Sequence, residues 1–114
     1  MKIYGNLTAQ LQIFETVMNE IGEPHKKWQT MHELSGFLDF INGAAECENL
    51  SANLQNSTHV FICDFVPLNS AVTSENSRMI INDKVYEVVL IDNPMEKNHH
   101  YEIFLRFAGG YNEV

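Results

Sequence analysis

The sequence predicts a mainly all-β protein: a small antiparallel barrel of six or seven short strands, with one short helix inserted midway. Two runs of β-branched and aromatic residues, Met79–Ile81 and Lys84–Ile91, meet at Asn82-Asp83. Asn and Asp tolerate positive φ, so this pair predicts a tight two-residue hairpin turn. Several other segments alternate apolar and polar residues, as half-buried strands do. Closure into a barrel would remove the sheet edges that invite aggregation.

Length and composition limit the class of protein. A chain of 114 residues with 45% hydrophobic content is expected to form one globular domain, spanning 1–114. The net charge of -8, with seven Lys and Arg scattered along the chain, argues against a protein that holds nucleic-acid phosphates by itself. No apolar run approaches the roughly 18 residues needed to cross a bilayer, so no membrane partner is expected. The absence of an apolar leader predicts an intracellular protein with reduced thiols.

The first half of the chain predicts an N-terminal arm over 1–8, followed by strands of the barrel, which is expected to span 9–109. Ala9–Asn19 alternates well and predicts a half-buried strand, and the Gly- and Pro-containing run Glu20–Lys26 predicts a hairpin loop. Two further runs have strand character, Lys27–Leu34 and Phe37–Ile41. Ser35-Gly36 between them indicates a bulge or a turn, and leaves open whether they form one bent strand or two.

The middle of the chain changes character. Residues 44–55 are rich in helix formers and lack β-branched residues, and Cys47, Leu50 and Leu54 recur at helical spacing. A helix of about three turns is marginal alone. The pattern therefore predicts a short helix within an excursion over 42–56, which either docks by that apolar stripe or is mobile.

The second half predicts the remaining strands. Ser57–Phe65 is apolar on both faces, as a central strand would be. The hairpin around Asn82-Asp83 ends near Asp92, Asn93–Asn98 predicts a turn, and His99–Phe107 alternates as the last strand. Residues 110–114 are expected to form a loose tail. The residues expected to build the barrel scaffold are Trp28, Val60, Ile62, Met79, Val85, Tyr86, Val89, Ile103 and Leu105.

Candidate catalytic and ligating residues have simpler structural explanations. His99-His100 would point to opposite faces of a strand, so the pair does not predict a metal site. Cys47 and Cys63 lie on predicted apolar faces, where a thiol acts as a small hydrophobe. Glu46 and Glu48 are two apart in a predicted helix and do not face one another. No phosphate-binding glycine loop is present. The expectation is therefore a protein that is not an enzyme and uses no metal or cofactor.

Four features of the chain carry a family resemblance when their order and spacing are taken together. They are the single Trp28 after a Gly-containing hairpin, the strand opening Thr58-His59-Val60, the run from Arg78-Met79-Ile80 through Asp83-Lys84 to Val85-Tyr86-Glu87-Val88, and the closing strand Tyr101–Phe107. On these features the chain, from about Ala9 to Gly109, resembles the head–tail joining proteins of long-tailed phages and prophages, also called head completion, head closure or stopper proteins. It departs from them at Thr8-Ala9-Gln10, where members often carry basic residues.

The resemblance implies a structural protein of the virion neck. Its subunits would form a ring between the portal or adaptor protein and the tail-completion protein, close the DNA channel after packaging, and provide a docking surface for the tail. DNA would pass nearby without sequence-specific binding. The implied location is the virion neck, and the host bacterial cytoplasm during assembly.

The implied channel-closing element is the excursion between strands, roughly Ile41–Asn56. Its candidate residues for channel closing or assembly are Glu46, Glu48, Asn49 and Asn53. A marginal helix can refold when neighbours supply the missing contacts, which is consistent with this implication.

Two other functions remain open from the sequence. The first is a generic SH3-like domain that acts as a protein–protein adaptor. The second is an OB-like nucleic-acid binder, which the acidic charge disfavours. The barrel itself is expected to be SH3-like.

Overall fold

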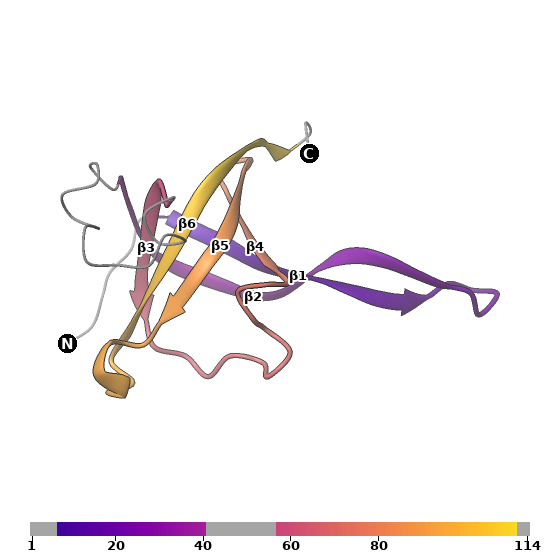
Figure 1. Ribbon diagram of the computed structural model, residues 1–114, viewed down its shortest axis with the longest axis horizontal. Helices are drawn as coiled ribbons and strands as arrows, with labels where there is room; N and C mark the ends of the chain where they lie inside the picture. Colours follow the sequence, from indigo (N-terminus) through magenta and orange to yellow (C-terminus); the bar gives the residue numbers. More distant parts are fainter. Residues whose placement is uncertain (1–6, 41–56, 112–114) are drawn as a thin grey trace.

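The computed structural model describes residues 7–40 and 57–111, which form six antiparallel strands in one sheet that closes on itself (Figure 1). Around the closed barrel the strands follow the order β1-β2-β3-β6-β5-β4, and β4 pairs with β1. The elements are β1 (Leu7–Met18), β2 (Pro24–Phe40), β3 (His59–Asp64), β4 (Ser77–Ile81), β5 (Lys84–Asp92), the 3-10 turn η2 (Pro94–Glu96) and β6 (His100–Gly110). The prediction of an all-β antiparallel fold is confirmed. The helix predicted over 44–55 lies outside the described residues.

The β4–β5 hairpin has the turn that its sequence predicts. Asn82 and Asp83 have φ of 51° and 61°, so both central residues are left-handed, as a type I′ turn requires. Ile81 and Lys84 face each other directly across the turn. The backbone amide of Tyr111 donates to the Asp83 carbonyl at 2.8 Å, which attaches the end of the described chain to this hairpin.

Strand β2 is one long strand, which settles the alternative that the sequence left open. Gly36, within the pair predicted as a bulge or turn, is an ordinary ladder position opposite Leu7 on one side and Cys63 on the other. A Cβ at Gly36 would lie 2.2 Å from the Ile62 carbonyl oxygen, so glycine is needed for close backbone approach. The irregularity between β1 and β2 lies instead at Leu11/Gln12, where β2 contributes one extra residue, Met31.

Both ends of the chain pair further than the sequence predicts. Strand β1 begins at Leu7, two residues before the expected start, because Leu7 and Thr8 pair with β2. Strand β6 continues to Gly110, which pairs with Lys84, although the expected last strand ended at Phe107. Glycine lacks a side chain to pack, but its backbone still completes the ladder.

The core lies inside the closed sheet. Its fully buried side chains come from β1, β3, β4 and β6, and β2 and β5 add buried residues such as Leu34 and Tyr86. The fully buried set is Leu11, Ile13, Phe61, Cys63, Met79, Ile81, Ile103 and Leu105. In β3 the buried face is Phe61 and Cys63, and Val60 and Ile62 lie on the other, partly exposed face. In β5 a register shift between Val88 and Leu90 leaves Val88 buried and Val89 partly exposed. In β5, bulges therefore decide which residues of the apolar run face the core.

Candidate interaction surface

The β1–β2 hairpin projects from the closed sheet as a two-stranded ribbon (Figure 1). Strand β1 pairs with β4 only from Ala9 to Ile13. The next residue, Phe14, donates its backbone amide to the carbonyl of Asn76, just before β4, at 2.9 Å. Six residues lie between Phe14 and Ile21 in the turn, so at about 3.3 Å per residue the ribbon extends about 20 Å. An isolated ribbon with open edges is marginal in water, which makes it suited to pairing with another protein.

The tip of the ribbon is held in shape by one side chain. The Asn19 carboxamide oxygen accepts hydrogen bonds from the backbone amides of Ile21 at 3.1 Å and Glu23 at 2.8 Å. The Gly22 amide donates to the Asn19 carbonyl at 3.0 Å, and Gly22 has a φ of +82°. This turn displays Ile21, which is 77% exposed, between the exposed acids Glu20 and Glu23.

One face of the ribbon is mainly apolar. Cross-strand partners point to the same side of a two-stranded sheet, so Phe14 lies with Trp28 and Met18 lies with Pro24. The Phe14 and Trp28 rings are 5.0 Å apart, and Phe14 and Met18 remain 42% and 65% exposed. Exposed apolar side chains gathered in this way on a ribbon are typical of a partner-binding surface.

The apolar face leads into a groove of about 480 Å³ at the base of the ribbon. Trp28 belongs to both surfaces. The residues that line the groove are Trp28, Ser74, Glu75, Ser77, Arg78, Val85, Glu87, Val88, Arg106 and Ala108. They come from β2, the connection before β4, and strands β4, β5 and β6, so the closure of the sheet assembles the groove.

Arg78 is the unusual residue of this groove, because it is only 9% exposed. Its guanidinium carbon lies 4.3 Å from the centroid of the Trp28 ring and 5.7 Å from that of Tyr111. Its Nε donates to the Gln12 carboxamide oxygen at 2.8 Å, and the Gln12 Nε2 donates to the Thr30 hydroxyl at 3.1 Å. Burial lowers the pKa of Arg78, and Tyr111 opposes that shift. A guanidinium stays protonated in proteins, so the groove carries a buried positive charge.

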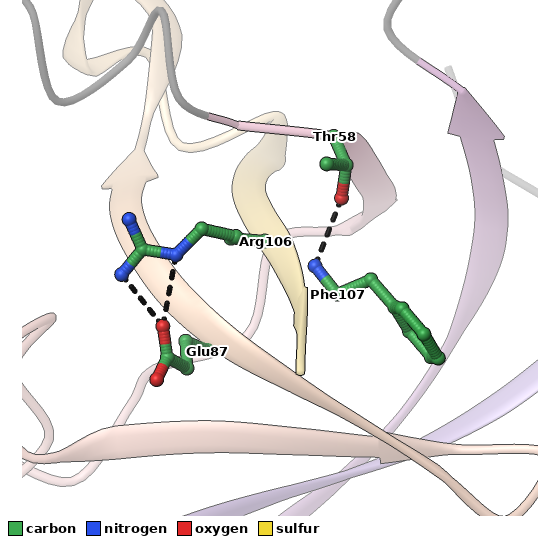
Figure 2. Close-up of polar contacts among 4 residues, drawn as sticks. All are labelled: Thr58, Glu87, Arg106 and Phe107. Carbon is green, nitrogen blue, oxygen red and sulfur yellow. Dashed lines mark hydrogen bonds and ion pairs between the residues drawn. The ribbon is translucent and has the colours of Figure 1, made fainter. Parts of the chain in front are cut away.

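A row of polar side chains crosses five strands at this place. Gln12 is opposite Thr30 and Arg78, Arg78 is opposite Glu87, and Glu87 is opposite Arg106. Figure 2 shows the end of the row, where Arg106 donates two hydrogen bonds to one Glu87 oxygen at 2.9 and 2.6 Å. Within residues 7–40 and 57–111, no carboxylate bonds the Arg78 guanidinium. Arg106 therefore has an acidic partner, and Arg78 has a neutral one.

A second polar contact in Figure 2 fixes the beginning of β3 against β6. The backbone amide of Phe107 donates to the Thr58 hydroxyl at 2.9 Å, and that hydroxyl also lies 2.8 Å from His59 Nδ1. The His59 ring stacks edge-on against Phe40 and Tyr86. Burial, and then the charge of Lys84, lower the pKa of His59. His59 is thus a packed residue that is held by Thr58 and by two aromatic rings.

The described residues contain no group of three His, Cys, Asp or Glu side chains that could hold a metal ion. Burial, and then Asp64, raise the pKa of the Cys63 thiol to about 12. A thiol that stays protonated at neutral pH is not a nucleophile.

No helix in the described part of the chain has the length and hydropathy to cross a membrane.

The candidate residues from the sequence fall into two sets. Glu46, Glu48, Asn49 and Asn53 lie outside the described residues. Of the scaffold residues, five are buried, namely Met79, Val85, Tyr86, Ile103 and Leu105, whereas Trp28, Val60, Ile62 and Val89 are partly exposed. Sequence reasoning missed the projecting ribbon and the Gln12–Arg78 contact. The ribbon had a usable signal, since Met18 and Ile21 continue an apolar pattern into a turn.

No protein-family model matches the chain, and no curated protein matches it. Two solved structures have a similar fold. Protein SF1141 from Shigella flexneri 2a has a TM-score of 0.66 at 16% identity, over 92% of this chain and 94% of that chain. A chain in the virion of a native gene transfer agent particle has a TM-score of 0.55 at 13% identity, over 92% of this chain and 98% of that chain. At these identities the likeness concerns the fold.

Proposed function

We propose that the chain is a structural protein of a phage-like particle and acts without catalysis. The observation that carries this proposal is the fold likeness to a chain of a gene transfer agent virion, which extends over 92% of this chain and 98% of that one. Likeness over nearly all of both chains supports a shared fold and not only a shared local motif. The sequence resemblance to head–tail joining proteins supports the same class independently.

Within the particle, the proposed place is the neck. The closed sheet, classed in this proposal as an SH3-like barrel, would repeat around a ring between the portal or adaptor protein and the tail-completion protein. The ring would close the DNA channel after packaging and offer a docking surface to the tail. The projecting β1–β2 ribbon supports an assembly role, because a ribbon with open edges and exposed Met18 and Ile21 gains stability by contacting a neighbour. Assembly would take place in the cytoplasm of the host bacterium.

The net charge of -8 also fits a channel component, since an acidic surface repels DNA that slides past it. In this proposal the segment around Glu46, Glu48, Asn49 and Asn53 faces the channel. DNA would then be a passing neighbour and not a ligand.

The direct test is to mix the purified chain with the portal–adaptor complex of the same particle and to image the product by electron cryo-microscopy. The expected result is an added ring of density beneath the adaptor, with one closed sheet per subunit. A portal–adaptor complex that gains no density at saturating protein would contradict the proposal. A monomeric chain in the absence of the complex would not, because a ring can require a template to assemble.

A further inference from the structure

We infer that the tip of the β1–β2 ribbon of one copy binds in the Arg78 groove of the next copy, so that the chains associate head to tail. This inference rests on the proposed ring function and gives it a defined interface. Two surfaces of the same chain carry the argument. They are the tip, formed by Glu20, Ile21 and Glu23, and the groove around Arg78 and Trp28.

The charges of the two surfaces are complementary at Arg78. The groove lining also holds Arg106 with Glu87, which pair with each other, and the acid Glu75. The groove holds a buried guanidinium that, among residues 7–40 and 57–111, donates to no carboxylate and has the Gln12 carboxamide oxygen as its acceptor. The tip presents two exposed carboxylates, on Glu20 and Glu23. An arginine fork binds a carboxylate through two parallel N–H donors, and Gln12 occupies only the Nε of Arg78. The remaining guanidinium donors suit an incoming acid.

The apolar groups are complementary as well. Ile21 is 77% exposed at the tip, and the groove walls include Trp28, Val85, Val88 and Ala108. The Asn19 side chain already fixes the turn through bonds to the Ile21 and Glu23 amides, so little backbone entropy is lost on binding. The tip is therefore a preorganised insert with an apolar centre and acidic flanks.

The geometry favours a neighbour over the same chain. The groove lies at the base of the ribbon, where Trp28 pairs with Phe14, and the tip is about 20 Å away along two paired strands. A tip cannot reach its own groove without unpairing its strands. Because the tip and the groove are different surfaces, the contact is heterologous, and such contacts form rings when the rotation between copies closes.

The sharpest test uses two variants that are each defective in one surface. Glu20→Lys with Glu23→Lys reverses the tip charge at exposed positions, and Arg78→Gln removes the groove charge but keeps a hydrogen-bonding side chain. Sedimentation velocity over a concentration series should show wild-type self-association and a weakening of about tenfold or more in each variant. An equal mixture of the two variants should form a species of two chains, because one intact tip meets one intact groove. The matched control, Glu33→Lys with Glu96→Lys, makes the same charge change at exposed positions outside both surfaces and should associate like the wild type.

A cysteine pair makes the test independent of the stability of the Arg78 variant. With Cys47 replaced by serine, Ile21→Cys and Ser74→Cys chains are mixed under oxidising conditions, and a disulfide between chains is expected only when both are present.

A wild type that stays monomeric at the highest concentration and a cysteine pair that gives no cross-link would overturn the inference. So would a variant mixture that forms no two-chain species. A ring on the portal–adaptor complex without the cross-link would leave the neck function standing and exclude this interface. A cross-link with no ring would leave this interface standing and contradict the neck function.

Discussion

The Arg78 guanidinium carbon lies 4.3 Å from the centroid of the Trp28 ring, although β4 and β2 are separated by β1 in the closed sheet. Gln12 lies on β1, the strand between them. It accepts a hydrogen bond from Arg78 and donates one to Thr30 of β2. Three strands are therefore joined by one polar cluster on the outer side of the sheet, in which Gln12 and Arg78 are buried and Thr30 is exposed. A cluster of this kind is worth more than a surface ion pair, because its two buried groups are shielded from water.

Arg78→Gln should lower the free energy of unfolding by about 2 kcal/mol, because it removes a cation–π contact and a charge-assisted hydrogen bond. Urea denaturation followed by the fluorescence of Trp28, the only tryptophan, measures both the stability and the local environment. The matched control is Arg106→Gln. Its ion pair with Glu87 has side chains 48% and 54% exposed, so the expected cost is about 0.5 kcal/mol. Equal costs for the two variants would mean that the Arg78 cluster contributes no more than a surface pair.

Gly36→Ala should destabilise the fold by about 3 kcal/mol or prevent folding, because the new Cβ would meet the Ile62 carbonyl oxygen at 2.2 Å and force β2 away from β3. Thermal unfolding followed by circular dichroism gives the change. Ser35→Ala, at the exposed neighbouring position, is the control and should unfold within a few degrees of the wild type. An unchanged melting temperature for Gly36→Ala would show that β2 and β3 can separate at no cost.

The stability of the protein should fall at alkaline pH partly through Cys63. Its pKa is raised to about 12 in the folded state from an ordinary value of 9.0, so the folded state favours the protonated thiol. That contribution is fully present below pH 9 and is lost as the pH rises toward 12. Chemical denaturation at several pH values should show a smaller alkaline loss for Cys63→Ala than for the wild type. Burial also raises the pKa values of Tyr86 and Tyr101, and both tyrosines titrate in both proteins. The quantity compared is therefore the slope of the unfolding free energy against pH. Parallel slopes would exclude a buried thiol as a source of the loss.

Deletion of residues 44–54 should leave a folded protein, because the six strands pair with one another without any residue of that segment. The melting temperature is expected to stay within a few degrees of the wild type. In the proposed neck ring the same deletion should let packaged DNA escape, which an assay of DNA retention in particles measures. Particles that retain their DNA would exclude this segment as the channel-closing element.

Local sequence signals predicted the parts of the fold that local chemistry controls. Asn82-Asp83 marked its turn because few residues adopt positive φ, and the alternation in β1 marked a half-buried strand. Gly36 was ambiguous, because a glycine needed for close approach between strands has the same local signature as a bulge or a turn. The registers at Leu11/Gln12 and Val88/Leu90 were not predictable, since a bulge depends on the partner strand. The Arg78 cluster joins residues 66 positions apart, and no local pattern records that distance.

The closing of the sheet by β1 and β4 has a consequence for how the chain folds. The β1–β2 and β4–β5 hairpins join neighbours in sequence, and hairpins of this kind form in about 1–10 μs. The bond between Gln12 and Arg78 spans 66 residues, so the loop-closure entropy of joining β1 to β4 is paid before its contacts form. We therefore expect the rate-limiting step of folding to be the meeting of these two preformed hairpins. Until it occurs, the open edges of β1 and β4 are exposed to other chains.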